Sequence, residues 1–243
     1  MVFTEPKILF LLPQYGGQVA TPFFESMLEW AQQASNHGVE WNWIIDPGST
    51  LLPMARSQLI ALAMELDDWT HIIMADADMG FSVDDLCKLV LADKDYIGAV
   101  YPAKGYPLQT TSSTKEGIYK TEGDLQQCKY IGTGLVCIKR ETIEKLYDKY
   151  EDQLSFTAVD GLKGEQTRYK VVDLFAIITN GGDKDDPDVY LTEDYAFAKR
   201  VRDAGMEVWQ HTKVNPAHTG MHTFSFKGEA SMIARYKKKN QLQ

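Results

Sequence analysis

Apolar and polar residues form two kinds of segment over the first hundred positions of the chain. Short, mostly apolar runs, typical of buried strands, occur at 7–12, 71–75 and 96–100, and a further strand is expected at 40–45. Between these runs apolar residues recur at helical spacing, which predicts helices at about 21–37, 53–66 and 84–91. Strands that alternate with helices in this order predict an α/β fold with a mostly parallel central sheet flanked by helices.

The pattern changes after Pro102. Residues 104–129 are polar and rich in Thr, Ser and Gly, which predicts loops or a small β-excursion. Further strands are expected at 129–138, 169–178 and 207–210, and further helices at 140–150 and 191–204. We therefore predict a single domain, 1–243, with a nucleotide-binding half at 1–102 and an acceptor half at 103–243 that ends in a basic tail.

The composition, with 44% hydrophobic and 24% charged residues, is that of an ordinary globular protein. No apolar run approaches the roughly 20 residues that a membrane helix needs. The net charge of −9 argues against a general nucleic-acid-binding surface, and the basic run at 235–239 is either a solvated terminus or an arm that contacts a polyanion. Three cysteines without a CxxC pair indicate a reducing compartment, so we expect a cytoplasmic protein.

Two carboxylates follow the apolar run at 71–75. Asp76 and Asp78 are spaced i, i+2, so in an extended chain both side chains project to the same side. Ligands of open α/β sheets bind at the carboxyl ends of strands, and a hard divalent cation together with substrate phosphates commonly occupies such a carboxylate pair. The alternative is an Asp-rich turn before the next helix, for which Ser82 is a plausible N-cap.

Four features in a fixed order resemble glycosyltransferases of the GT-A fold, of a family-2-like type. They are a strand–helix–strand opening with Asp46 at a strand end, the DxD-like Asp76-Ala77-Asp78, an ED motif at Glu193-Asp194, and His218-Thr219-Gly220 late in the chain. Gly132-Thr133-Gly134 also resembles the acceptor-side glycine turn of that family. The resemblance covers nearly the whole chain except 151–190. It is greatest to small stand-alone enzymes of bacteriophage genomes, which implies the host cytoplasm as the location.

The resemblance implies a metal-dependent enzyme that takes a sugar from a nucleotide-diphosphate sugar, with a UDP-sugar as the expected donor. It implies Mn²⁺ or Mg²⁺ as the cofactor, with Asp78 as the direct ligand, Asp76 on the ribose or on the ion through water, and His218 completing the metal shell. His222 is the fallback ligand. The remaining donor-side residues implied are Pro13, Gln14, Tyr15, Asp46, Arg56, Ala77 and Lys104. Arg56 suits a diphosphate because a guanidinium donates a planar fork of hydrogen bonds, although a surface arginine is an equally good interpretation.

On the acceptor side, the resemblance implies that Asp194, beside Glu193, removes the proton of an acceptor hydroxyl in an inverting reaction. The alternative is that both acids only favour the start of a helix electrostatically, and a retaining enzyme would not need the base. Gly132, Thr133 and Gly134 are assigned to the acceptor side, and Trp209 is left open as a further contact.

Two other functions fit the same sequence less well. A sugar-nucleotide pyrophosphorylase or other nucleotidyltransferase would carry a glycine-rich loop with basic residues after the first strand, and Tyr15-Gly16-Gly17-Gln18 lacks them. A non-catalytic nucleotide-sugar-binding module is the third class. The acceptor stays open between a protein, a lipid-linked sugar, a capsule glycan and a hydroxymethylated DNA base.

Overall fold

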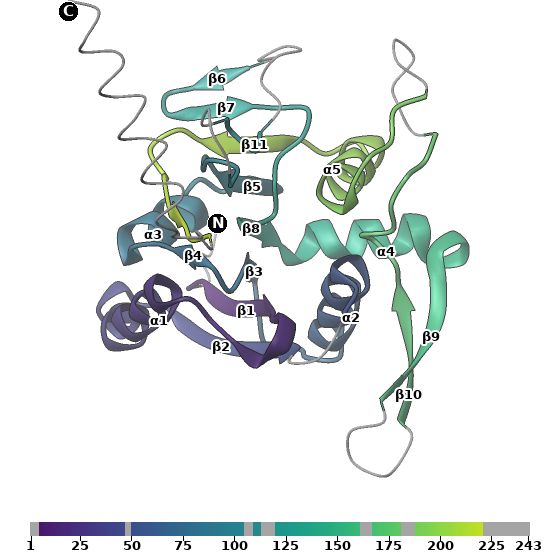
Figure 1. Ribbon diagram of the computed structural model, residues 1–243, viewed down its shortest axis with the longest axis horizontal. Coiled ribbons are helices and arrows are strands. Elements are labelled where there is room, and N and C mark those ends of the chain that lie inside the picture. Colours follow the sequence, from purple (N-terminus) through teal and green to yellow (C-terminus); the bar gives the residue numbers. More distant parts are fainter. Residues whose placement is uncertain are drawn as a thin grey trace, which may run out of the picture.

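A computed structural model of the chain describes residues 5–46, 50–104, 109–112, 120–160, 167–180 and 188–220. An eight-stranded sheet forms its centre, with the strand order β2-β1-β3-β8-β5-β11-β7-β6 (Figure 1). In chain order these strands are β1 (Lys7–Pro13), β2 (Glu40–Asp46), β3 (His71–Ala75), β5 (Tyr96–Ala99), β6 (Thr121–Glu122), β7 (Leu125–Gln127), β8 (Leu135–Lys139) and β11 (Val208–His211).

The central strands confirm the predicted, mostly parallel α/β sheet. Strand β1 pairs in parallel with β2 and β3, and β11 pairs in parallel with β5. Strand β8 lies antiparallel between β3 and β5, so these five parallel strands run in one direction and β8 runs against them. The start of β8 therefore lies at the same edge of the sheet as the carboxyl end of β3, because Leu135 pairs with Ala75.

In the described ranges, five α-helices cover the sheet: α1 (Thr21–Gln33), α2 (Leu52–Met64), α3 (Val83–Leu91), α4 (Arg140–Leu154) and α5 (Glu193–Asp203). Short 3-10 turns occur at η1 (Tyr15–Gly17) and η2 (Ala34–His37). Adjacent strand residues face opposite sides of the sheet. Ile72 accordingly lies in a buried cluster with side chains of α2, α4 and α5, whereas Ile73 lies in a second cluster with side chains of α1 and α3.

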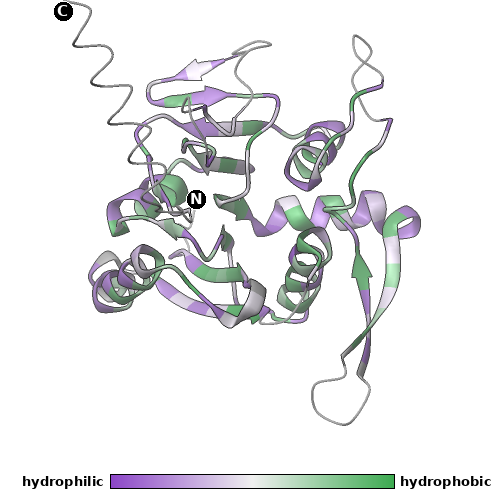
Figure 2. Ribbon diagram, viewed as in Figure 1, coloured by the Kyte–Doolittle hydropathy of each residue, from purple (hydrophilic) through white to green (hydrophobic). Residues whose placement is uncertain are grey.

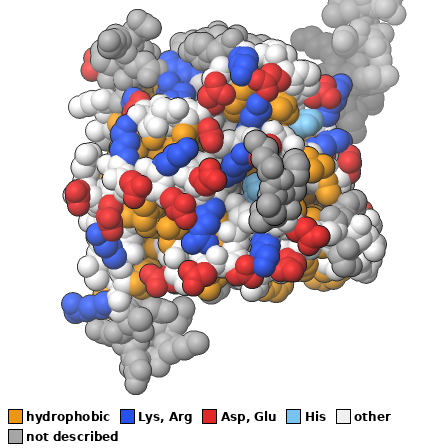
Figure 3. All heavy atoms as spheres, turned by 180° about the vertical axis from the view of Figure 1, so that it is seen from behind, with side chains coloured by type: hydrophobic (Ala, Val, Ile, Leu, Met, Phe, Trp, Pro, Cys, Tyr) orange, Lys and Arg blue, Asp and Glu red, His pale blue; other side chains and the backbone are white. Residues whose placement is uncertain are grey.

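The hydropathy of the elements differs between the centre and the edge of the sheet. Figure 2 shows that α2 is mostly hydrophobic, whereas β6 and β7 at the far edge of the sheet are mostly hydrophilic. On the opposite face of the molecule, acidic and basic side chains are interspersed with hydrophobic ones (Figure 3). Within the part of the chain that the structure describes, no helix is both long enough and apolar enough to span a bilayer.

The starts of α3 and α1 are capped differently. Ser82 caps α3 as expected: its hydroxyl accepts from the backbone N–H of Asp85 at 3.1 Å, and the Asp85 carboxylate accepts from the backbone N–H of Ser82 at 3.0 Å. Helix α1 has no such cap, because Ala20 takes the N-cap position without a side-chain hydrogen bond and Thr21 is the first helical residue.

The second half of the chain departs most from the sequence pattern. The strand predicted at 129–138 begins only at Leu135, after the turn at 132–134. The strand predicted at 169–178 ends at Val172, and it forms a hairpin with a strand that was not predicted: β9 (Ser155–Asp160) pairs antiparallel with β10 (Thr167–Val172). Two short strands, β4 (Met79–Gly80) and β12 (Ala217–His218), also pair antiparallel, and they place His218 opposite Met79.

Candidate active site

One edge of the sheet gathers most of the residues selected from the sequence. The carboxyl ends of β1 and β2 meet there, because Pro13 pairs with Asp46 and the backbone N–H of Gln14 donates to the Asp46 carbonyl at 3.0 Å. Beside them, the backbone N–H of Asp76 donates to the Gly134 carbonyl at 2.9 Å. The edge thus combines the ends of three parallel strands with the turn that precedes β8, which is where open α/β sheets bind ligands.

Arg56 on α2 binds three carboxylates at this edge. Its side chain is only 1% exposed, and it donates to Asp76 at 2.9 Å, to Glu193 at 3.1 Å and to Asp194 at 2.5 Å. Burial by itself would lower the pKa of Arg56, but the negative charges of Asp76 and Asp194 outweigh burial and raise it. The guanidinium is therefore a permanent positive charge that fixes the carboxylates of two distant segments.

This contact corrects the expectation that Arg56 binds a diphosphate. Both terminal nitrogens of the guanidinium already bind carboxylates, and the side chain is closed off from solvent. The sequence could not reveal these partners, because Asp76, Glu193 and Asp194 lie 20, 137 and 138 residues away. Arg56 is instead a positioning residue for the acidic groups of the site.

The cluster keeps an excess of negative charge. One guanidinium and three carboxylates leave a formal net charge of −2. Burial raises the pKa of Asp76, and the positive charge of Arg56 offsets this only in part. Burial also raises the pKa of Glu193, and the neighbouring charge of Asp194 raises it further. A site with this charge balance gains from a bound cation.

Asp78 and His218 lie beside this cluster and have the chemistry of metal ligands. The Asp78 Oδ1 atom is buried and has no hydrogen-bond partner among the described residues, and His218 Nε2 lies 3.6 Å from it. His218 Nδ1 lies 2.8 Å from the Pro102 carbonyl oxygen. Because a carbonyl only accepts, Nδ1 carries the proton and the lone pair of neutral His218 is on Nε2, toward Asp78.

A divalent cation fits between these two atoms. An unpaired carboxylate oxygen and an oriented imidazole nitrogen are both usual ligands of Mn²⁺, and the mixed oxygen and nitrogen set also occurs with other divalent metals. Within the described residues no group of three or more His, Cys, Asp or Glu side chains could hold a metal. The two protein ligands would thus need phosphate oxygens to complete the shell, as is common for Mg²⁺-type sites.

The other residues expected on the metal and donor side have different surroundings. Both carboxylate oxygens of Asp76 accept from Arg56, at 2.9 and 3.2 Å, so the Asp76 carboxylate faces the guanidinium that also binds Glu193 and Asp194. The ammonium of Lys104 pairs with the second oxygen of Asp78. His222 and the basic run at 235–239 lie outside the described residues, as does the side chain of Tyr15. Ala77 contributes its carbonyl, which accepts from the Ala20 N–H at 2.8 Å.

The turn at 132–134 packs tightly under the site. A Cβ atom on Gly132 or Gly134 would lie 2.5 or 2.6 Å from the Tyr101 hydroxyl oxygen, a distance that real structures do not tolerate. The backbone N–H of Gly134 donates to that hydroxyl at 2.8 Å. Thr133, between the two glycines, is fully buried and donates its hydroxyl to Asp194 at 2.5 Å. The sequence pointed to this turn, but it could not show what Tyr101 and Thr133 contact.

Trp209 does not belong to the site. Its side chain has no exposed surface, and its indole N–H donates to Glu207 at 3.1 Å. The ammonium of Lys94 lies 4.2 Å from the centroid of its ring. The idea that Trp209 contacts the acceptor is therefore wrong, because a tryptophan in the middle of β11 packs into the core.

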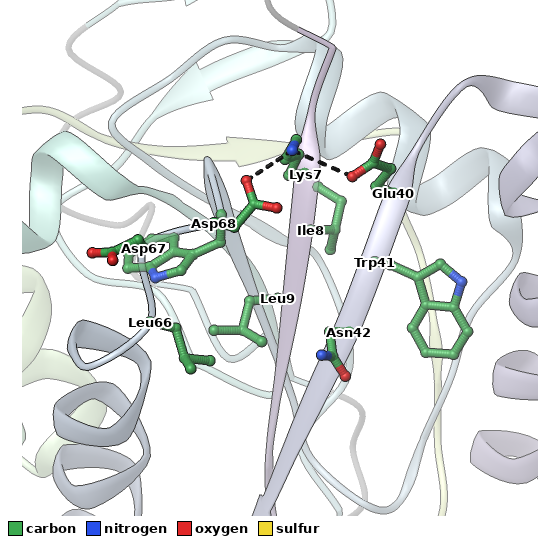
Figure 4. A pocket seen from close by; sticks show the side chains of 10 residues that line it. Lys7, Ile8, Leu9, Glu40, Trp41, Asn42, Leu66, Asp67 and Asp68 are labelled. Atoms are coloured by element: carbon green, nitrogen blue, oxygen red, sulfur yellow. Dashed lines mark hydrogen bonds and ion pairs between the residues drawn. The ribbon is translucent and has the colours of Figure 1, made fainter.

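A cavity of about 380 Å³ lies at the other end of the strands (Figure 4). Lys7 and Glu40, the first residues of β1 and β2, line it together with Asp68. The Lys7 ammonium lies between these two acids, 2.7 Å from Asp68 and 3.3 Å from Glu40. Because the strand starts form this cavity, it is separate from the carboxylate edge.

Comparison with known proteins identifies the fold. No protein-family model matches the sequence, and a search of curated proteins found no match. The structure of A197 from STIV matches with a TM-score of 0.50 and 16% identity, covering 88% of this chain and 86% of A197. This likeness shows a shared fold.

Two lower-scoring structural matches are glycosyltransferases by name. The catalytic domain of Drosophila β1,4-galactosyltransferase 7, in complex with xylobiose, matches with a TM-score of 0.48 and 13% identity over 92% of this chain and 78% of that one. GalNAc-T7, with UDP, GalNAc and Mn²⁺, matches with a TM-score of 0.45 and 11% identity over 90% of this chain and 44% of that one. TM-scores below 0.5 are too low to assign a fold or an activity.

Proposed function

We propose that the protein is a metal-dependent glycosyltransferase of GT-A type, which moves a sugar from a nucleotide-diphosphate sugar, a UDP-sugar, to an acceptor hydroxyl with inversion. One observation carries the proposal. At a single sheet edge, a metal-type pair, Asp78 and His218, adjoins a carboxylate, Asp194, that other side chains hold in place. Displacement at an anomeric carbon needs a cation that stabilises the departing diphosphate. It also needs a base held close to the acceptor hydroxyl.

The donor side of the edge would bind the nucleotide. Pro13, Gln14 and Asp46 are joined through the ends of β1 and β2, where they would contact the nucleobase and ribose. The Lys104 side chain is 44% exposed, so its ammonium can exchange Asp78 for a diphosphate oxygen. Asp78 and His218 would hold a divalent cation, which would supply Lewis-acid stabilisation of the diphosphate leaving group.

The acceptor side of the edge would remove the proton of the acceptor hydroxyl. Asp194 accepts the proton of the acceptor hydroxyl, and the resulting oxygen nucleophile attacks the anomeric carbon from the side opposite the diphosphate. Arg56 holds Asp194 in place, because it binds that carboxylate at 2.5 Å. Attack from the opposite side inverts the anomeric configuration, which NMR of the product detects directly.

The metal pair is tested by Asp78→Ala. We expect the variant to lose UDP release from a UDP-sugar in Mn²⁺ and to bind Mn²⁺ more weakly in calorimetry, because the unpaired oxygen that faces His218 is gone. Asp84→Ala is the matched control: it removes one exposed carboxylate from α3, whose ion-pair partner among the described residues is Lys88. Wild-type activity of Asp78→Ala in EDTA-treated buffer would refute the metal site.

The acceptor we propose is a hydroxyl of a glycan or of a hydroxymethylated pyrimidine in phage DNA. Labelled sugar from a UDP-sugar, offered in parallel with hydroxymethylated DNA and with oligosaccharide acceptors, would appear in only one product. Release of UDP without any labelled product would count against both acceptor classes while leaving the donor site intact.

A further inference from the structure

Asp194 is held through one of its two carboxylate oxygens. Both hydrogen bonds that reach it, from the Arg56 guanidinium and from the Thr133 hydroxyl, end on Oδ1 at 2.5 Å. No described side chain donates a hydrogen bond to Oδ2. The Asp194 side chain is 24% exposed. The arrangement thus separates a held oxygen from an oxygen that is available to a substrate.

The neighbours of Thr133 hold it in position for this contact. Gly132 and Gly134 leave the space that Tyr101 fills, since a Cβ on either would meet the Tyr101 hydroxyl oxygen within 2.6 Å. The backbone of Gly134 is bonded on both sides: its N–H donates to the Tyr101 hydroxyl at 2.8 Å, and its carbonyl accepts from the Asp76 N–H at 2.9 Å. The turn is therefore rigid, and it presents the Thr133 hydroxyl to α5.

The Thr133 contact is of the strong kind. The Thr133 hydroxyl donates to a carboxylate oxygen, and hydrogen bonds to carboxylates are about twice as strong as bonds between neutral groups. Thr133 has no exposed surface, so water does not compete for its hydroxyl. Arg56 alone would hold one point of the carboxylate, whereas two donors from different directions also restrict its rotation.

We propose that Thr133 is a positioning residue for the catalytic base: together with Arg56 it fixes Oδ1 of Asp194, so that Oδ2 receives the acceptor proton. This inference rests on the proposed glycosyltransferase function and assigns Thr133 to the base instead of to the acceptor. In the reaction, the acceptor O–H proton moves to Oδ2 and the acceptor oxygen forms a bond to the anomeric carbon. The bond from that carbon to the diphosphate oxygen breaks, and its electron pair leaves with the diphosphate.

Two substitutions separate the hydroxyl from the shape of the side chain. Thr133→Val keeps the volume and removes the donor, whereas Thr133→Ser keeps the donor and removes a methyl group. We expect kcat for transfer to fall roughly 10- to 100-fold in the valine variant, the usual effect of losing one hydrogen bond to a charged group. Serine should restore kcat to within about threefold. UDP-sugar affinity should stay within about twofold, because the described contacts of Thr133 lie on the base side.

Thr142→Val is the matched control. Thr142 lies on α4, away from the site, and is also fully buried. Its hydroxyl donates to the Asp95 carbonyl at 2.9 Å. We expect this variant to lose thermal stability to a similar extent and to keep its kcat. A fall in kcat that matches the loss of stability in both variants would show that Thr133 is only structural.

One further measurement keeps the inference distinct from the proposed function. The ¹³Cγ chemical shift of Asp194 should change in the valine variant and recover in the serine variant, whether or not the enzyme turns over. An unchanged ¹³Cγ shift, or wild-type kcat in Thr133→Val, overturns the role of Thr133. Absence of UDP release by the wild type overturns only the proposed function.

Discussion

Replacement of Arg56 by Met removes the positive charge that holds three carboxylates together. Methionine fills a similar volume, but the cluster changes from a formal net charge of −2 to −3. Breaking a buried ion pair by removing one partner costs about 3–5 kcal/mol. The carboxylates of Asp76, Glu193 and Asp194 are 20–27% exposed, so water offsets part of this loss. We therefore expect a loss of about 3 kcal/mol at pH 7, which corresponds to a fall in Tm of roughly 6–12 °C for a chain of this size.

The pH dependence of this loss is the sharper test. The folded state raises the pKa of Asp76 and of Glu193 through burial, so the folded chain binds more protons than the unfolded chain in the acid range. Their contribution to stability is present below the unfolded pKa and is lost as pH rises through the folded pKa. Arg56 is the group that lowers the pKa of Asp76, so its removal widens this difference. Arg56→Met should therefore recover stability, relative to the wild type, as pH falls from 8 to 5.

Urea unfolding at several pH values between 5 and 8 measures the effect. Arg200→Met is the control, because Arg200 is also buried but donates to the Leu174 and Ala176 carbonyls at 3.0 and 2.7 Å, which do not titrate. Its loss of stability should vary much less with pH. If Arg56→Met loses the same free energy of unfolding at pH 5 as at pH 8, the charge-balance reasoning is refuted.

Two further substitutions test the two sides of the site. Asp194→Asn should leave UDP-sugar binding nearly intact and reduce transfer by roughly 10²–10⁴-fold, the usual contribution of a general base; an equal loss of donor affinity would mean that Asp194 only supports the start of α5. Lys104→Met should bind Mn²⁺ a few-fold more tightly in the absence of nucleotide, because a cation no longer competes for Asp78, and should bind the UDP-sugar more weakly. Lys88→Met, which removes an ammonium paired with Asp84, should change neither affinity.

The sequence by itself determined the local structure of the first half. The strands predicted at 7–12, 40–45 and 71–75 became β1, β2 and β3 within a residue at each end. For β1 and β3 the reason is that a buried strand in a parallel sheet needs a nearly continuous apolar run, whereas β2 lies at the edge of the sheet and none of its residues is buried. Ser82 capped α3 for a similarly local reason, since the cap and its partner Asp85 are three residues apart. The position of Asp76 at a strand end likewise followed from the run that precedes it.

Only the tertiary structure decided what these residues contact. The partners of Arg56 lie up to 138 residues away, and the Thr133 hydroxyl meets Asp194 across 61 residues. Periodicity reports which face of an element is apolar, and it carries no information about which polar group of a distant segment will face that element. The same limit explains Trp209, whose burial depends on β7 and on Lys94 packing around β11. Residue types and their order therefore indicated a carboxylate site, while the fold alone assigned each carboxylate its partner.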